Sequence, residues 1–232
     1  MLRNEPHTYP QSVSKLRAAT FNVHHCEGID GRVDVGRIAD VIKRTEADLI
    51  ALQELDRGMP RSDGTDQPAE LERLTGMTVT FHPTLSRGGG EYGIAVAARG
   101  EAAFDLKPLP RIADEEPRGL QVGEYRGVTV FATHLSLRRA PRVRQTAALI
   151  SAIERYGGPF LLLGDLNQSS WALRRAARGA FYVPVVPRRT MARRWAQRDH
   201  VVAGRGARVT GRDVIPGPAS DHYALVADVA IP

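Results

Sequence analysis

The sequence predicts an α/β or α+β domain in which sheets and helices form layers. Short apolar strands alternate with two segments of helical spacing, and several strands in the middle of the chain follow one another directly. This mixture is not typical of a repeating βαβ barrel. The length of 232 residues suits one large domain, and a hydrophobic fraction of 42% argues against a disordered chain.

The first part of the chain predicts a strand, a helix and a second strand. These segments are residues 16–22, 33–46 and 48–53. Apolar residues recur at helical spacing in the middle segment, and Asp34 is its expected N-cap. The third segment is a continuous apolar run that ends at Glu54, as a buried strand would.

The middle of the chain has a β pattern. Three further strands are predicted over residues 92–98, 120–125 and 128–133. A tight turn at Arg126-Gly127 joins the last two. The stretches 57–68 and 183–187 are rich in proline and glycine, and we expect them to be surface loops.

A second helix is predicted to open at Pro141. Its apolar residues are expected to share one face, formed by Val143, Ala147, Ile150 and Ile153. Three more buried strands are predicted over residues 160–163, 200–203 and 224–231. Gly164 is expected to stop the first of these strands.

Charge and cysteine content limit the class of protein. The chain carries 32 basic and 26 acidic residues, and all basic residues except three lysines are arginine. Arginine binds phosphate and carboxylate through paired hydrogen bonds, so we expect an anionic partner. A GC-rich genome would give the same composition, and that alternative stays open. The single cysteine, Cys26, excludes an internal disulfide and is expected to be a small buried residue.

The first 15 residues are polar and lack the apolar core of a secretory signal, so we expect a short lead-in before a domain over 16–232. No run approaches the ~20 apolar residues of a membrane span. We therefore expect a cytoplasmic monomer without a membrane span.

Polar residues that can bind a metal or move a proton lie at the ends of the apolar strands. They are Asn22, Glu54, His134, Asp165 with Asn167, Asp199, and Asp221 with His222. Each one alone has an ordinary explanation as a turn residue, a helix cap or the solvated end of a strand. Together they indicate a shared cleft, because side chains at strand ends can converge while the strands stay dry.

The motifs that carry these residues resemble those of the endonuclease/exonuclease/phosphatase superfamily, the metal-dependent hydrolases with a deoxyribonuclease I-like fold. In chain order they are TFNVHH (20–25), ALQELDRG (51–58), GGGEYGIAV (88–96), EPRG (116–119), THLSL (133–137), LLLGDLN (161–167), RDHVVA (198–203) and SDHYAL (220–225). The resemblance covers roughly residues 16–232. It implies a four-layer α/β/β/α sandwich of two mixed β-sheets flanked by helices.

The resemblance also implies a Mg²⁺ or Mn²⁺ ion. Glu54 would be the main metal ligand, Asn22 its neighbour on the first strand, and Asp221 a further member of the acidic group. Such a set of oxygen ligands suits a hard divalent cation.

In the implied reaction, water attacks the phosphorus of a phosphoester. Asp165 would orient or deprotonate that water, while Asn167 and His134 would contact oxygens of the phosphate. His222 and Asp199 resemble the His–Asp pair of the family, in which the carboxylate orients the imidazole. Arg118 is a candidate phosphate clamp, although an arginine after proline can equally brace a loop.

The chain departs from the nearest branch of the superfamily at one position. Ile94 stands where that branch carries asparagine, so a polar group near the cleft is expected to be missing. His24 and His25 follow Asn22, and the alternation of a strand end would point them to opposite sides.

The partner is expected to be a phosphoester, either nucleic acid or a small phosphodiester. A phosphodiesterase or nuclease is the main hypothesis; the alternatives are a phosphatase or lipid-headgroup phosphodiesterase and a catalytically silent binding module. Three arginine clusters, within 138–144, 174–178 and 188–198, form either a track for a polyanion or solvated faces. Trp171 and Trp195 either stack on bases or fill the core, and we expect the core.

Overall fold

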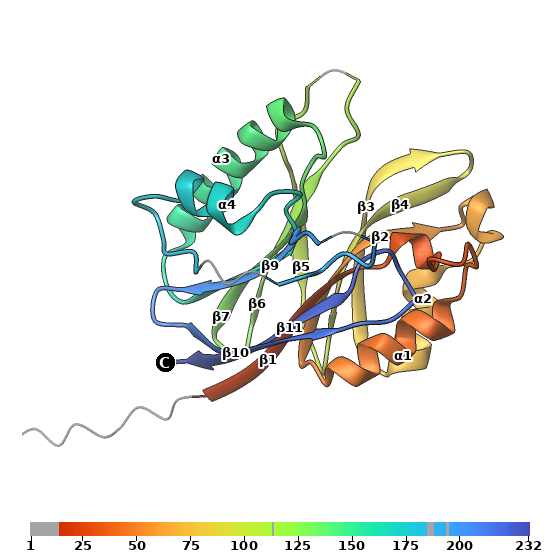
Figure 1. Ribbon diagram of the computed structural model, residues 1–232, viewed down its shortest axis with the longest axis horizontal. Coiled ribbons are helices and arrows are strands. Elements are labelled where there is room, and N and C mark those ends of the chain that lie inside the picture. Colours follow the sequence, from red (N-terminus) through yellow and green to blue (C-terminus); the bar gives the residue numbers. More distant parts are fainter. Residues whose placement is uncertain (1–13, 113, 185–187, 194) are drawn as a thin grey trace, which may run out of the picture.

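Two mixed β-sheets lie face to face, and helices cover the outer face of each sheet (Figure 1). The computed structural model describes residues 14–232 except 113, 185–187 and 194. The predicted four-layer α/β/β/α sandwich is confirmed. Of the lead-in expected over residues 1–15, residues 1–13 lie outside the described part of the chain.

The first sheet contains two parallel neighbours at its centre and antiparallel strands on either side. In the described residues it has six strands, which are in sheet order β10 (Arg208–Ile215), β11 (Ala224–Ile231), β1 (Ser14–Asn22), β2 (Leu49–Arg57), β4 (Gly90–Ala98) and β3 (Thr78–Arg87). The parallel pair is β1 and β2. The strand predicted over residues 224–231 matches β11 in both bounds.

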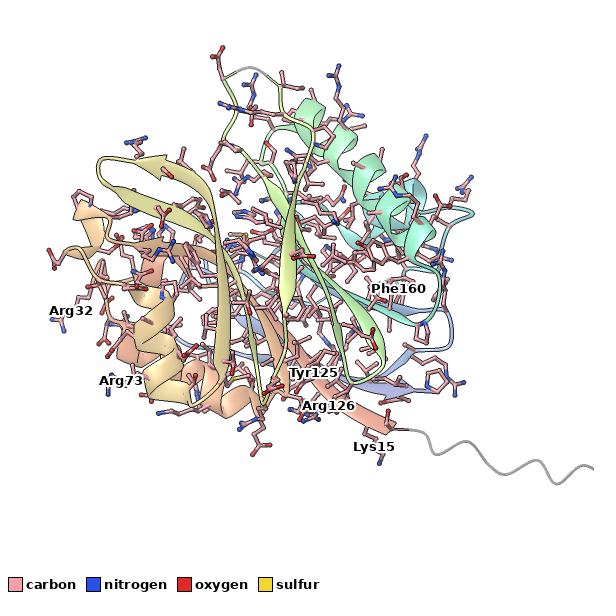
Figure 2. The ribbon with its side chains drawn as sticks, turned by 180° about the vertical axis from the view of Figure 1, so that it is seen from behind. Lys15, Arg32, Arg73, Tyr125, Arg126 and Phe160 are labelled. Carbon is pink, nitrogen blue, oxygen red and sulfur yellow. The ribbon has the colours of Figure 1, made fainter. Side chains whose placement is uncertain are left out.

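The second sheet repeats this plan with one parallel pair, β7 and β8. Its five strands, counted over the described residues, are β5 (Phe104–Pro108), β6 (Gly119–Tyr125), β7 (Val128–His134), β8 (Phe160–Asp165) and β9 (Asp199–Gly204). Arg126 and Gly127 join β6 to β7 with φ of 47° and 79°, the left-handed pair that a tight hairpin turn requires. Figure 2 shows this turn beside Lys15, at the end of the molecule where β1 begins.

Four α-helices and two short 3₁₀ helices occur in the described residues. They are α1 (Val35–Thr45), α2 (Gln67–Thr75), α3 (Arg139–Tyr156), α4 (Ser170–Ala176), η1 (His24–Cys26) and η2 (Pro60–Ser62). The expected N-cap of α1 is confirmed, because the Asp34 carboxylate accepts a hydrogen bond from the Arg37 amide at 3.1 Å. The stretch 57–68, expected to be a loop, contains η2 and the start of α2. The other expected loop, 183–187, lies partly outside the described residues.

Alternate residues of the central strands serve two different cores. In β2, Leu49 and Ala51 face the second sheet, while Ile50 and Leu52 face α1 and α2. The second sheet buries Phe131 and Phe160 against α3 and α4 in the same manner. Because both faces of these strands are covered, the strands are continuous apolar runs rather than alternating patterns.

The buried face of α3 differs from the prediction. Of the four residues expected to share it, Ile153 is buried, whereas Val143 is 59% exposed and Ala147 is also exposed. The helix instead buries a face that includes the polar residue Gln145, whose amide accepts from the Ser136 backbone N–H at 2.9 Å. The hydrogen bond to the loop after β7 sets the rotation of the helix, which apolar spacing alone does not show.

Two strands continue past the residues at which they were expected to end. β2 runs through Glu54 to Arg57, with a register shift between Gln53 and Leu55 where it pairs with β4. β8 includes Gly164. A Cβ at this position would lie 2.0 Å from the Thr133 carbonyl oxygen of β7, so a residue with a side chain would not fit between the two strands. Gly164 is therefore a site of close approach between neighbouring strands and not a strand terminator.

The strand directions bring the ends of both sheets to one rim. The start of β1 and the C-terminus lie together at the lower end of the molecule (Figure 1). Asn22 and His222, beside the opposite ends of β1 and β11, therefore lie at the other end of the sandwich. The ends of β7 and β8 and the start of β9 meet in register, with His134 paired to Asp165 and Asp165 paired to Asp199.

None of the helices in the described ranges has the length and apolar character needed to cross a membrane.

Gly164→Ala should destabilise the fold by forcing β7 and β8 apart. We expect the free energy of unfolding to fall by about 2 kcal/mol or more, the effect of an overpacked site against backbone atoms. Chemical denaturation measures the loss. Gly217→Ala is the matched control, since its added Cβ would meet only ordinary contact, 3.5 Å from Arg44. Equal stability of the two variants would contradict the close-approach role of Gly164.

Candidate active site

A single amide joins the two sheets at the rim. The Asn22 side-chain nitrogen, at the end of β1, donates to Glu54 Oε1 of β2 at 2.7 Å and to Asp165 Oδ2 of β8 at 3.2 Å. The Asn22 oxygen accepts from the His24 backbone N–H at 3.0 Å, which fixes the orientation of the amide. Two carboxylates from different sheets are thus held on one donor group.

Glu54 reaches the rim because β2 is irregular at this residue. Its φ of 64° is in the left-handed region, and the register shift of β2 against β4 occurs here. A positive φ is uncommon for glutamate and persists only where the surrounding structure imposes it. The side chain keeps 22% of its surface exposed, so the carboxylate is open to a ligand from solvent.

His222 and Asp199 form a buried pair. His222 Nδ1 lies 2.9 Å from Asp199 Oδ2, and Asp199 is fully buried. Burial alone would lower the pKa of His222, but the charge and hydrogen bond of Asp199, with the charges of Asp165 and Asp221, raise it to about 10. At neutral pH the imidazole is therefore positively charged, with Nε2 3.8 Å from Asp165 Oδ2.

His134 is held in one neutral tautomer by an arginine. Arg118 Nη1 lies 2.7 Å from His134 Nδ1, and because guanidinium only donates, Nδ1 accepts and the proton is on Nε2. Burial, with the charges of Arg118 and His222, lowers the pKa of His134 well below its usual value. Nε2 lies 3.6 Å from Asp165 Oδ2 and 3.8 Å from Glu54 Oε1.

Asp165 occupies the centre of the group. Burial and the neighbouring Asp199 carboxylate raise its pKa to about 6, against the opposing effects of His222 and of hydrogen bonds from Asn167 and Asn22. The Asn167 backbone N–H donates to Asp165 Oδ1 at 2.9 Å. This turn places Asn167 at φ 50°, where its side-chain nitrogen donates to the Leu135 carbonyl and lies 3.2 Å from His134 Nε2.

The structure brings together eight of the nine predicted site residues. They are Asn22, Glu54, Arg118, His134, Asp165, Asn167, Asp199 and His222. Asp221 shares no hydrogen bond or ion pair with Asn22 or Glu54 in the described residues, and it lines a separate hollow with His24 and Glu27. Its effect on the group is the charge that it adds beside His222.

The two histidines after Asn22 do not point to opposite sides as expected. Strand β1 has ended before them, and His24, His25 and Cys26 all have positive φ. Their conformation brings the two rings together, with centroids 4.4 Å apart. Cys26 is buried, as predicted.

Sequence reasoning missed Tyr92 and Glu116, which border the group. Burial raises the pKa of the Tyr92 hydroxyl, and the Glu54 and Glu116 carboxylates raise it further. Arg118, predicted as a candidate clamp, has its Nη1 3.1 Å from Glu116 Oε1. Both residues belong to motifs that were already singled out in the sequence. Tyr92 lies in GGGEYGIAV, at the start of β4, and Glu116 lies in EPRG, two residues before Arg118. Their place in these motifs could have identified them.

The donor chemistry fits a hard divalent cation. Among the described residues no lysine or arginine nitrogen lies within 4 Å of the Glu54 carboxylate, and its nearest base is neutral His134. Asp165 and Asp199 place further carboxylate oxygens within 4.8 Å of each other, whereas protonated His222 has no lone pair for a metal. Carboxylate oxygens without a cationic partner at a partly open rim are the ligands that such an ion requires.

Comparison with known proteins gives one matching family and several similar structures. The family model described as Endonuclease/Exonuclease/phosphatase family matches residues 19–222. No curated protein matches the chain. An endonuclease/exonuclease/phosphatase from Beutenbergia cavernae is similar at 25% identity and a TM-score of 0.74, covering 94% of this chain and 72% of that one.

Two further structures share the fold at lower identity. The human Nocturnin catalytic domain with bound sulfate is 18% identical, with a TM-score of 0.68 over 94% of this chain and 95% of that one. A mannosyl-6-phosphatase from Bacteroides thetaiotaomicron is 14% identical, with a TM-score of 0.66 over 92% and 99%. The family match includes every residue of the buried group, and the chain belongs to the endonuclease/exonuclease/phosphatase family.

Proposed function

We propose that the protein is a divalent-metal-dependent phosphodiesterase that uses an activated water to cleave its substrate. The observation that carries this proposal is the Asn22 amide, which holds the Glu54 and Asp165 carboxylates. Beside them lie two histidines, one neutral and one positively charged. Members of the family are typically phosphoester hydrolases. The group contains a base, a cation and neutral donors within one rim, as hydrolysis at phosphorus requires.

Glu54 is the residue that we propose as the metal ligand. Asn22 presents its nitrogen to Glu54, so its role is to orient the carboxylate rather than to bind the ion through its oxygen. A bound Mg²⁺ or Mn²⁺ ion would neutralise charge on the phosphate and on the leaving oxygen.

Asp165 is the proposed base for the attacking water. Its pKa near 6 leaves it ionised at neutral pH yet basic enough to accept a proton. The Asn167 backbone N–H holds one carboxylate oxygen at 2.9 Å and the Asn22 amide holds the other at 3.2 Å. These two hydrogen bonds fix the orientation of the carboxylate relative to the proposed water.

His222 and His134 are proposed to contact the phosphate in different ways. His222 is positively charged and is oriented by Asp199. Its imidazolium N–H is proposed to donate a hydrogen bond to a non-bridging phosphate oxygen or a proton to the leaving group. Neutral His134, oriented by Arg118, supplies an N–H without a full charge. Asn167 adds a third polar side chain on the same side of Asp165.

The charge balance favours a diester over a monoester. The cations of the group, Arg118 and His222, are already paired with Glu116 and Asp199. A diester carries one negative charge and a monoester about two at neutral pH, so the monoester requires more positive charge than the paired cations leave. The alternative of a phosphatase or headgroup hydrolase rests on the hollow of about 410 Å³ beside Arg61 and Tyr92, which suits a small organic group.

Glu54→Ala should abolish metal-dependent turnover while the fold is retained. We expect wild-type protein with Mg²⁺ or Mn²⁺ to hydrolyse bis(p-nitrophenyl) phosphate faster than p-nitrophenyl phosphate, and EDTA to stop both reactions. Glu91→Ala, on the neighbouring β4, is a control, because Glu91 pairs with Arg57 at the end of β2. Failure of the wild-type protein to hydrolyse any diester or monoester would refute the proposal, and faster monoester cleavage would favour the phosphatase.

Asp165→Asn and His222→Ala should each lower kcat on a diester by roughly 10²- to 10⁴-fold, the usual contribution of acid–base groups. Both are buried beside polar partners, so thermal melting must first show that each variant is folded. His24→Ala, next to the group but outside its hydrogen bonds to Asp165, should retain most activity. Near-normal turnover in either variant would remove that residue from the mechanism.

Asp199→Asn should lower the pKa of His222 from its value of about 10. The Asp199 charge opposes the effect of burial, and its removal leaves only the charges of Asp165 and Asp221 to do so. Imidazole resonances of the metal-free protein, followed by NMR against pH, should show His222 protonated to about pH 10 in the wild type. Asp228→Asn, on the far part of β11, should leave that titration unchanged. An unchanged His222 titration in Asp199→Asn would contradict the pairing.

A further inference from the structure

The segment between the two buried aspartates has an unusual charge. Residues 166–198 contain eight arginines and no aspartate or glutamate. Since the whole chain has a net charge of +6, the rest of the chain is slightly acidic. The excess positive charge of the protein is thus concentrated in one segment rather than spread over the surface.

Three large aromatic side chains of this segment are exposed. Trp171 is 67% exposed, Tyr182 66% and Trp195 83%. The expectation that the two tryptophans fill the core is therefore wrong. Exposed tryptophan is costly to leave in water, and on a folded surface it marks a binding site more often than chance.

The aromatic side chains line two adjoining hollows together with arginines. Trp171 and Trp195 line one hollow with Arg188 and Arg198. Trp171 also lines the second hollow with Tyr182, and the Arg174 guanidinium lies 6.0 Å and 5.1 Å from the centres of these two rings. We call this set, Trp171, Arg174, Tyr182, Arg188, Trp195 and Arg198, the basic-aromatic surface.

The arginines of the basic-aromatic surface are free to bind an anion. In the described residues none of the three has a carboxylate within 4 Å, whereas arginines elsewhere, such as Arg37, Arg61 and Arg73, are paired. Phosphate groups are the anions that guanidinium binds in paired geometry. Aromatic rings beside them stack on bases, and only unpaired bases expose a face for stacking.

The surface is attached to the catalytic rim. Arg198 Nη1 donates to the Asn167 carbonyl at 3.2 Å, and Arg198 directly precedes Asp199. Ser170, at the start of α4, donates to Gln197 at 3.0 Å and so ties the helix of Trp171 to the segment of Trp195. The basic-aromatic surface and the proposed site are therefore joined through one continuous, hydrogen-bonded segment.

We propose that the basic-aromatic surface binds single-stranded nucleic acid and guides it to the rim. The proposal deepens the proposed function and rests on it for the cleavage step, since it names the substrate class of that site. Arginines hold the phosphates, and the two tryptophans and Tyr182 stack on successive bases. A duplex would meet the arginines alone, because its bases are already stacked.

A binding measurement under conditions that prevent cleavage tests the proposed nucleic-acid surface. A fluorescent single-stranded oligonucleotide of roughly 16 nucleotides is titrated in EDTA by anisotropy, with the full-length protein. Trp171→Ala/Trp195→Ala removes two stacking contacts and should weaken binding roughly 30-fold or more. The affinity for a duplex of the same sequence should fall much less in this variant. Hydrolysis of bis(p-nitrophenyl) phosphate should be unchanged, because neither tryptophan contacts the catalytic group.

Arginine variants test the phosphate contacts separately. Arg174→Gln should reduce the slope of log affinity against log salt by about 0.7, the value for one contact to a single strand. Arg208→Gln is the matched control, since Arg208 is exposed at the start of β10, paired in register with Ala230 at the opposite end of the sandwich. It removes the same charge and should leave the slope unchanged.

Each outcome decides the proposal. Tryptophan-dependent binding of the single strand supports it, even if the small diester is not cleaved, in which case the proposed function fails alone. Binding that is absent, or that survives loss of both tryptophans, overturns it. Tryptophan-dependent binding of phosphatidylserine vesicles without binding of the oligonucleotide overturns it in favour of a membrane surface. A wild type that cleaves the small diester but ignores the oligonucleotide overturns it and leaves the proposed function intact.

Discussion

The candidate catalytic rim depends on one amide that lies between two carboxylates. Glu54 and Asp165 belong to different sheets and would repel each other in a buried setting. The Asn22 nitrogen donates to both, so its two N–H groups set the spacing of the sheets where packing of apolar side chains ends. Ser220 supports the arrangement by donating to the Asn22 carbonyl at 2.8 Å, which connects β1 to the loop that carries His222.

Two buried residues of the same type carry different charges in this group, because their neighbours differ. His134 and His222 are both buried, yet one faces a guanidinium and the other a carboxylate. The first is neutral and the second is charged at the same pH. Asp165 and Asp199 differ in their partners, since only Asp199 has a directly bonded imidazole. Neighbouring partners, rather than residue type, set the role of each group.

The sequence predicted most of the central strands and nearly all of the buried group, because apolar runs followed by polar residues are local features. It did not predict β3, β5 and β10, whose residues are only partly buried and carry a weak pattern. The rotation of α3 depends on hydrogen bonds of Gln145, to Ser136 in the preceding loop and to the carbonyl of Pro110, which is far away in the sequence. The bulge at Glu54 and the exposure of Trp195 likewise arise from pairing and packing between segments far apart in the chain.

The pairing of Asp165 with Asp199 separates the proposed catalytic groups from the proposed binding surface. The 33-residue segment between them begins and ends on adjacent strands whose register the sheet fixes. Closing such a loop costs little more when it lengthens, about 0.6 kcal/mol for each doubling. Changes at the exposed positions of the segment, such as Trp171, Tyr182 and Trp195, are therefore expected to leave both aspartates in place. Evolution or protein engineering could thus change what this segment binds while the proposed catalytic groups keep their geometry.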